Sequence, residues 1–162
     1  MERRFQVFPV DNSPGFIISH LAREVNACLY RAFMKNGFNI TAQQWGVLSK
    51  IKECEGLHQS EIAELTVKNR HNISRILRHL EQSGLINKEH DPVDKRLHRI
   101  YATTKGREMH SKLAVIAEQT AVKLFSGVSD GDMDTLKRIY RRVLVNAGGD
   151  MHTNNQGGYS DG

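Results

Sequence analysis

The chain has 162 residues, of which 39% are hydrophobic and 25% charged, and its formal net charge is +5 at pH 7. This length suffices for one domain, or for one compact module with an extension that needs a partner. The sequence has no run of 18 apolar residues and no signal-peptide pattern, which disfavours a membrane protein and predicts a soluble protein of the cytoplasm. Its two cysteines, Cys28 and Cys54, lack CxxC spacing, so neither a disulfide framework nor a structural zinc site is expected.

The first part of the chain predicts three helices. Apolar residues recur at four-residue steps between residues 14 and 36, which is typical of a helix. Thr41–Gln44 has the form of a capping box and predicts a second helix over residues 42–53. A short third helix is expected over residues 59–65, although His58 stands where serine or threonine would be a better cap.

A fourth predicted helix is basic on one face. Asn69 can cap it and Gly84 ends it. Its apolar stripe consists of Ile73, Ile76, Leu77 and Leu80. At about 100° per residue, the opposite face consists of His71, Arg75, Arg78 and Gln82, flanked by Asn72, Ser74 and His79. A solvated surface helix ordinarily mixes charges of both signs, so the lack of acids on this face indicates an anionic partner.

Residues 85–102 predict a two-stranded hairpin with a basic tip. Asp91 starts a turn, because Pro92 disfavours a helical conformation in the residue before it. From Lys68 to Arg99 there are eight basic residues against four acids, so most of the net charge lies in this segment. Positive charge localised in this way points to a polyanion, most commonly nucleic acid.

A short helix, a turn and a basic helix follow one another in the order of a helix-turn-helix, whose second helix enters the major groove of DNA. The hairpin would lie beside that helix as a wing, with its tip reaching a phosphate or the minor groove. Arginine pairs with guanine and asparagine with adenine in the major groove. The candidate DNA contacts are Arg70, His71, Asn72, Ser74, Arg75, Arg78, Lys95 and Arg96.

Two more helices complete the chain. Thr103 can cap a fifth helix that reaches Phe125, and Ser129 a sixth that ends near Asn146. The first, fifth and sixth helices carry more apolar surface than a small winged helix can cover, which predicts burial between two chains. The candidate dimer contacts are Phe16, Ile17, Leu136, Ile139, Tyr140 and Val143.

The expected fold class is mainly α with a small β-hairpin wing. The predicted parts are an N-terminal arm (1–13), a helical dimerisation region from both termini (14–40 and 103–146), a winged helix-turn-helix DNA-binding domain (41–102) and a tail (147–162). The tail is rich in glycine and polar residues, which predicts disorder.

The run from Ile62 to Met109 resembles the winged helix-turn-helix of the MarR family of bacterial transcription regulators. The most specific pieces are LEQSGLI (80–86), DPVDKR (91–96) and TTKGRE (103–108), and the resemblance extends over residues 14–146. It implies a homodimeric, sequence-specific regulator, more often a repressor than an activator, that reads a pseudo-palindromic operator. It also implies that Asp94 pairs with Arg96 to shape the wing, that Arg96 approaches the minor groove, and that Arg75 contacts DNA.

The same resemblance implies regulation by a small aromatic or phenolic effector, held between the DNA-binding and dimer regions. The candidate pocket residues are His20, Tyr30, Phe33 and Trp45, although residues of these types in such helices are more often simply part of the core. Redox sensing through Cys28 is an alternative, although its place in the middle of a helix favours an inert thiol.

Metal binding and catalysis have less support. Two pairs of possible metal ligands are close in sequence, namely His20 with Glu24 and Glu108 with His110. No His-x-x-x-His pair occurs, so no metal site is expected. No nucleophile elbow, phosphate loop or paired carboxylates are present, which predicts that the protein is not an enzyme and needs no cofactor.

Two other classes of function remain open from the residues alone. A non-specific architectural protein would bind unrelated duplexes with similar affinity, and an adaptor that uses the winged helix to bind protein would show little salt-sensitive affinity for DNA. The sequence also leaves open the operator, the regulated genes, the identity of an effector, the sign of regulation, and redox activity at Cys28 or Cys54.

Overall fold

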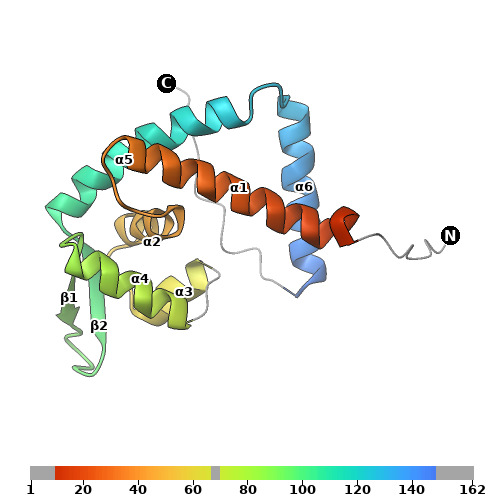
Figure 1. The fold of residues 1–162 in the computed structure, drawn as a ribbon. Helices are drawn as coiled ribbons and strands as arrows, with labels where there is room; N and C mark the ends of the chain where they lie inside the picture. Colours follow the sequence, from red (N-terminus) through yellow and green to blue (C-terminus); the bar gives the residue numbers. More distant parts are fainter. Residues whose placement is uncertain (1–9, 67–69, 149–162) are drawn as a thin grey trace, which may run out of the picture.

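The computed structural model describes residues 10–66 and 70–148 of the chain (Figure 1). Its elements are a 3-10 turn (Val10–Asn12), α1 (Pro14–Lys35), α2 (Ala42–Glu53), α3 (Gln59–Leu65), α4 (Arg70–Gln82), β1 (Ile86–His90), β2 (His98–Ala102), α5 (Thr104–Leu124) and α6 (Asp130–Asn146). This order confirms the predicted fold class. The proposed cap Asn69, most of the N-terminal arm and nearly all of the tail lie outside the described residues.

The predicted capping residues start the helices. Thr41 Oγ1 accepts a hydrogen bond from Gln44 N (3.1 Å), while Gln44 Oε1 accepts one from Thr41 N (2.8 Å), which completes the capping box of α2. Thr103 Oγ1 accepts from Gly106 N (3.0 Å) at the start of α5. Ser129 Oγ accepts from Asp132 N (3.2 Å) at the start of α6. These bonds satisfy backbone N–H groups that have no partner within the helix.

One hydrophobic core joins the winged helix to the helices on either side of it. Fully buried side chains from α1, α2, α3, α4, β2 and α5 meet there, namely Phe33, Val47, Leu48, Ile51, Ile62, Ile73, Leu77, Leu80, Ile100 and Leu113. Phe33 of α1 and Leu113 of α5 stand in the predicted dimerisation region, yet both belong to this core. Packing therefore continues across the sequence boundaries proposed at residues 40 and 102.

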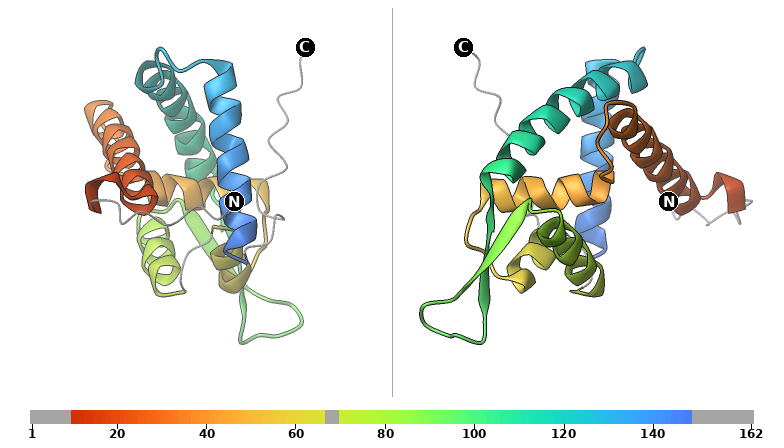
Figure 2. Two further views of the ribbon diagram at one scale, coloured as in Figure 1. Left: turned by 90° about the vertical axis from the view of Figure 1, so that its right-hand side faces the viewer. Right: turned by 60° about the vertical axis from the view of Figure 1, so that its left-hand side comes forward.

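The hairpin is extended by a short contact from the segment before α3. β1 and β2 are antiparallel, with Ile86 opposite Ala102 and His90 opposite His98. On the other side of β2, Ile100 N donates to Leu57 O (3.0 Å). Ile86, Ile100 and Ala102 are buried, so the base of the hairpin is fixed in the core while its tip projects beyond the helices (Figure 2).

The start of α5 lies against the end of α4. Thr103 N donates to Leu85 O (3.1 Å), and Thr103 Oγ1 donates to Gly84 O (2.7 Å). A Cβ atom at Gly106 would lie 2.0 Å from Leu85 O. Only glycine fits there without a shift of the backbone, which gives a physical reason for the glycine in the TTKGRE segment.

Much apolar surface remains exposed on α1, α5 and α6. α5 runs away from the winged helix, and α6 turns back from its far end (Figures 1 and 2). No residue of α6 is buried. The candidate dimer contacts have exposed fractions of 39–52%, and they are Phe16, Ile17, Leu136, Ile139, Tyr140 and Val143. In the described ranges, no helix is both long and apolar enough to span a membrane.

Candidate nucleic-acid interface

α4 separates apolar and basic side chains as its periodicity predicts. Ile73, Ile76, Leu77 and Leu80 are buried, and the exposed side chains include His71, Asn72, Arg75, Arg78 and His79. We call these five residues the recognition face. Within the part of the chain that the structure describes, neither Arg75 nor Arg78 has an ion-pair partner. Unpaired guanidinium groups on an exposed helix are suited to an external anion. α4 begins at Arg70, whose side chain lies outside the described set.

Ser74, predicted as a DNA contact, also forms a hydrogen bond within the protein. It is half-buried, and its hydroxyl oxygen accepts a hydrogen bond from Gln59 Nε2 (2.6 Å). This bond joins the start of α3 to α4 and so helps to fix the angle between the two helices of the helix-turn-helix. The Ser74 hydroxyl keeps one proton that it can donate.

The wing tip is organised by an aspartate–arginine pair. Arg96 Nε donates to Asp94 Oδ1 (3.0 Å) and Arg96 Nη2 to Asp94 Oδ2 (2.9 Å), and Arg96 N also donates to Oδ1 (3.0 Å). These bonds from the Arg96 side chain and backbone lower the pKa of Asp94. The Arg96 side chain is nevertheless 90% exposed. Asp94 therefore orients the Arg96 guanidinium, and the remaining N–H groups of this guanidinium stay accessible to a ligand.

Asp91 is the buried centre of the wing, although the sequence predicts only that it starts a turn. Its side chain is 5% exposed. Oδ1 accepts from Val93 N (2.8 Å) and Asp94 N (3.0 Å), and Oδ2 accepts from Arg99 Nε (2.7 Å). The backbone hydrogen bonds from Asp94 and Val93, followed by the Arg99 guanidinium, hold the pKa of Asp91 far below its ordinary value despite burial.

His58 joins this centre to the helix-turn-helix. Its Nε2 lies 3.0 Å from Asp91 Oδ2, and its Nδ1 lies 3.3 Å from Glu61 Oε2. Its backbone N–H donates to Glu61 Oε2 (2.7 Å), which completes the first turn of α3. The histidine that is a poor helix cap thus connects α3 to the wing. We call His58, Asp91 and Arg99 the wing clamp.

Replacing Asp91 by asparagine is expected to destabilise the protein at pH 7. The neutral amide cannot accept hydrogen bonds from both Arg99 and His58 with the strength of the charged carboxylate. The pKa of Asp91 is lower in the folded chain than in the unfolded chain, where it is about 3.9. The ionised carboxylate therefore stabilises the fold at pH values above about 3.9, and this stabilisation is lost progressively as the pH falls below that value. The difference in free energy of unfolding between wild type and Asp91→Asn should therefore narrow below about pH 4.

Urea denaturation at pH 7 and at successively lower pH measures this difference. Asp134→Asn, at an exposed carboxylate of α6, serves as the control and is expected to have little effect at either pH. A constant difference for Asp91→Asn across the pH range would show that its ionisation does not contribute.

A pair of histidines lies at the base of the wing tip. His90 and His98 are opposite each other on β1 and β2, with ring centroids 4.6 Å apart. His90 Nδ1 lies 3.0 Å from the carbonyl oxygen of Lys95. Because a carbonyl only accepts, His90 must carry its proton on Nδ1 for this bond, which then fixes the backbone next to the basic tip.

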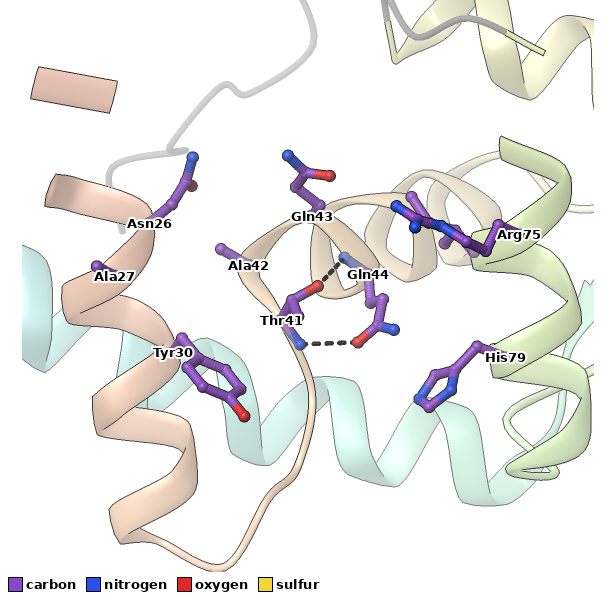
Figure 3. A pocket seen from close by; sticks show the side chains of 10 residues that line it. Asn26, Ala27, Tyr30, Thr41, Ala42, Gln43, Gln44, Arg75 and His79 are labelled. Atoms are coloured by element: carbon purple, nitrogen blue, oxygen red, sulfur yellow. Dashed lines mark hydrogen bonds between the residues drawn. The ribbon is translucent and has the colours of Figure 1, made fainter. Parts of the chain in front are cut away.

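A cavity of about 560 Å³ opens between α1, the start of α2 and α4 (Figure 3). It is lined by Asn26, Ala27, Tyr30, Thr41, Ala42, Gln43, Gln44, Arg75, Ile76 and His79. Of the four candidate effector residues, only Tyr30 belongs to this lining. Phe33 is fully buried with Trp45 packed edge-on against it (5.8 Å between centroids), and His20 stacks on Phe16 along α1.

The other candidate side chains are found in separate places. Arg31 Nη2 donates to Cys28 Sγ (3.1 Å), and Cys54 is exposed. His110 Nε2 lies 3.0 Å from Ser49 Oγ, and burial lowers the pKa of His110. Among the residues whose structure is described, no group of three or more His, Cys, Asp or Glu side chains could hold a metal ion.

A basic recognition helix with an adjoining basic hairpin is the arrangement of winged helix-turn-helix DNA-binding proteins. Comparison with known proteins agrees. Residues 40–98 match the model of the MarR family. The chain is 23% identical to the transcriptional regulator HosA of Escherichia coli over 106 residues, which cover 65% of this chain and 78% of HosA.

Solved structures extend the similarity to most of the chain. A crystal structure of MarR is 25% identical, with a TM-score of 0.71 over 88% of this chain and 95% of MarR. The repressor CouR bound to a 23-mer DNA duplex is 21% identical, with a TM-score of 0.75 over 88% of this chain and 99% of CouR. CouR of Rhodococcus jostii bound to p-coumaroyl-CoA has a TM-score of 0.69 at 22% identity, over 83% of this chain and 94% of CouR.

The chain thus contains a MarR-family domain over residues 40–98, in a fold that it shares with MarR. It is a DNA-binding transcriptional regulator, and its named relatives are regulators rather than enzymes.

Proposed function

We propose that the protein is a homodimeric repressor that binds a pseudo-palindromic operator in the cytoplasm and leaves it when a small aromatic or phenolic effector binds. The observation that carries this proposal is the recognition face of α4, where neither Arg75 nor Arg78 has an ion-pair partner among the described residues, beside a wing whose Arg96 is 90% exposed. The existence of CouR structures with DNA and with an acyl-CoA supports both parts of the proposal.

In this proposal the recognition face enters the major groove. Arg75 and Arg78 contact guanine or a phosphate, and Asn72 contacts adenine. Lys95 and Arg96 of the wing reach a phosphate or the minor groove. The wing clamp holds these two surfaces at a fixed separation, because it links the start of α3 directly to the hairpin.

Replacing Arg96 by alanine is expected to weaken operator binding by roughly 1 kcal/mol or more, which is about fivefold or more. The slope of log affinity against log salt concentration should become shallower by about 1, which corresponds to the loss of one phosphate contact. Arg96→Lys keeps the charge but loses the two-point pairing with Asp94, so its affinity should lie between those of wild type and Arg96→Ala. Fluorescence anisotropy with labelled operator measures both. Wild-type affinity in the alanine variant would remove the wing from the DNA contact.

The proposed dimer buries the exposed apolar residues of α1 and α6. Ile139 is 48% exposed on α6, and a two-fold axis would bury this stripe in both chains. Ile139→Asp should therefore dissociate the dimer, because it places an unpaired charge in the interface twice. Arg138→Asp introduces the same residue on the opposite face of α6 and should leave the dimer intact. Sedimentation equilibrium distinguishes the two, and an intact Ile139→Asp dimer would contradict this interface.

A further inference from the structure

Two adjacent residues at the start of α3 contact the two surfaces that are proposed to bind DNA. The His58 side chain reaches the wing, where its Nε2 lies 3.0 Å from Asp91 Oδ2. The Gln59 side chain reaches the recognition helix instead, where its Nε2 donates to Ser74 Oγ (2.6 Å). The start of α3 therefore connects the wing to α4 through side chains that are not themselves proposed to contact DNA.

A continuous chain of hydrogen bonds leads from His58 to the guanidinium at the wing tip. His58 Nε2 must carry the proton of the first bond, because the Asp91 carboxylate only accepts. Asp91 Oδ1 accepts from Asp94 N (3.0 Å). The Asp94 carboxylate in turn accepts from Arg96 Nε (3.0 Å) and Nη2 (2.9 Å). Because Arg96 is 90% exposed, this chain ends at a group that can contact DNA.

The turn of the wing also has hydrogen bonds that do not involve His58. Asp91 Oδ1 accepts from the backbone N–H groups of Val93 and Asp94, and Oδ2 accepts from Arg99 Nε (2.7 Å). These three partners belong to the hairpin itself, whereas His58 belongs to the segment before α3. Loss of the His58 side chain would therefore leave the turn formed, and it would remove a bond that ties the turn to the helix-turn-helix.

We infer that His58 is a positioning residue for DNA binding, which holds the wing against the helix-turn-helix so that Arg96 reaches the DNA. This inference rests on the proposed function, in which Arg96 contacts the operator. The side chains of His58 and Asp91 are 25% and 5% exposed, so their bond is screened less by water than an exposed ion pair. The wing is thereby ordered before DNA binds, which reduces the entropy lost on binding.

His58→Ser separates positioning from folding. Serine is a favourable N-cap residue, so α3 should remain stable, but its side chain is too short to reach Asp91. We expect operator affinity to fall about two- to fivefold. His58→Gln should restore most of this affinity, because its amide nitrogen can replace Nε2 as the donor to Asp91. No loss of affinity in His58→Ser, or an equal loss in His58→Gln, would overturn the positioning role.

A double-mutant cycle tests whether His58 acts through Arg96. In the Arg96→Ala protein, adding His58→Ser should weaken operator binding by less than about 1.5-fold, because the group that His58 positions is absent. Gln59→Ala is the matched control, since it removes the adjacent side chain, which is bonded to Ser74 of α4. Its effect should be the same with and without Arg96. Fluorescence anisotropy with labelled operator gives the four affinities of each cycle, and equal losses from His58→Ser with and without Arg96 would overturn the inference.

A distance measurement without DNA separates this inference from the proposed function. Spin labels would be placed at Val93 of the wing and Glu64 of α3, both exposed, after the two native cysteines are replaced by serine. Electron–electron double resonance should give a broader distance distribution in His58→Ser than with His58 present, and Gln59→Ala should leave the distribution unchanged. An equally narrow distribution in His58→Ser would overturn the role of His58 in holding the wing.

Failure of the proposed function gives a different result. If the wild-type protein did not prefer its own upstream DNA, the operator proposal would be contradicted. The distance distributions would still decide whether His58 holds the wing against the helix-turn-helix.

Discussion

Gly106→Ala is expected to destabilise the protein by roughly 2–4 kcal/mol, among the larger effects of a single methyl group. The added Cβ would lie 2.0 Å from Leu85 O, and this oxygen accepts the Thr103 N–H bond that fixes the start of α5. Backbone atoms on both sides of the contact must move, so the junction between α4, the hairpin and α5 is strained or opened.

Gly46→Ala is the matched control for this prediction. Gly46 is in the interior of α2, and a Cβ there would have no atom within 4 Å. Alanine should stabilise the helix by roughly 0.5–1 kcal/mol through propensity alone. Urea denaturation followed by circular dichroism gives both values. If Gly106→Ala were as stable as wild type, the close contact would not be a constraint on the fold.

Arg75→Ala is expected to have the largest effect on DNA binding, with a loss of about 1–3 kcal/mol, or roughly five- to 150-fold. Arg75 is exposed on the recognition face and has no ion-pair partner among the described residues, so its removal leaves no buried group unpaired. The thermal stability should accordingly remain close to that of wild type.

Lys112→Ala controls for the loss of one positive charge. Lys112 is exposed on α5, outside the recognition face and the wing. Its replacement should change operator affinity by less than about twofold at physiological salt, because the charge is screened over a Debye length of about 8 Å. Equal losses for Arg75→Ala and Lys112→Ala would indicate that net charge, rather than the recognition face, determines affinity.

Local sequence rules were sufficient for the helices and the hairpin. The periodicity of Ile73, Leu77 and Leu80 identified the buried stripe of α4, and the capping box at Thr41–Gln44 located the start of α2. Both signals arise within one turn or one face of a helix, so they are readable without knowledge of the tertiary structure.

Contacts between distant segments could not be read in this way. His58 and Asp91 are 33 residues apart in sequence, and nothing in the local pattern of either predicts that they meet. The Gln59–Ser74 bond is similar, because a polar residue on a helix reveals its face but not its partner. The pocket residues also depend on contacts between distant segments, and of the four predicted from the sequence only Tyr30 lines the cavity. Aromatic residues of α1 and α2 are candidates by type, but packing places Phe33 in the core and brings Arg75 of α4 into the wall of the same cavity as Tyr30.

The central claim, sequence-specific binding by the recognition face and the wing, is tested most directly by fluorescence anisotropy. The wild-type protein would be titrated against DNA from upstream of its own gene and against a scrambled duplex of the same length and composition, each at two salt concentrations. We expect a preference of about a thousandfold or more for the upstream DNA. Equal affinity for both duplexes, falling steeply and in parallel with salt, would contradict specific recognition of that DNA and favour a non-specific architectural protein.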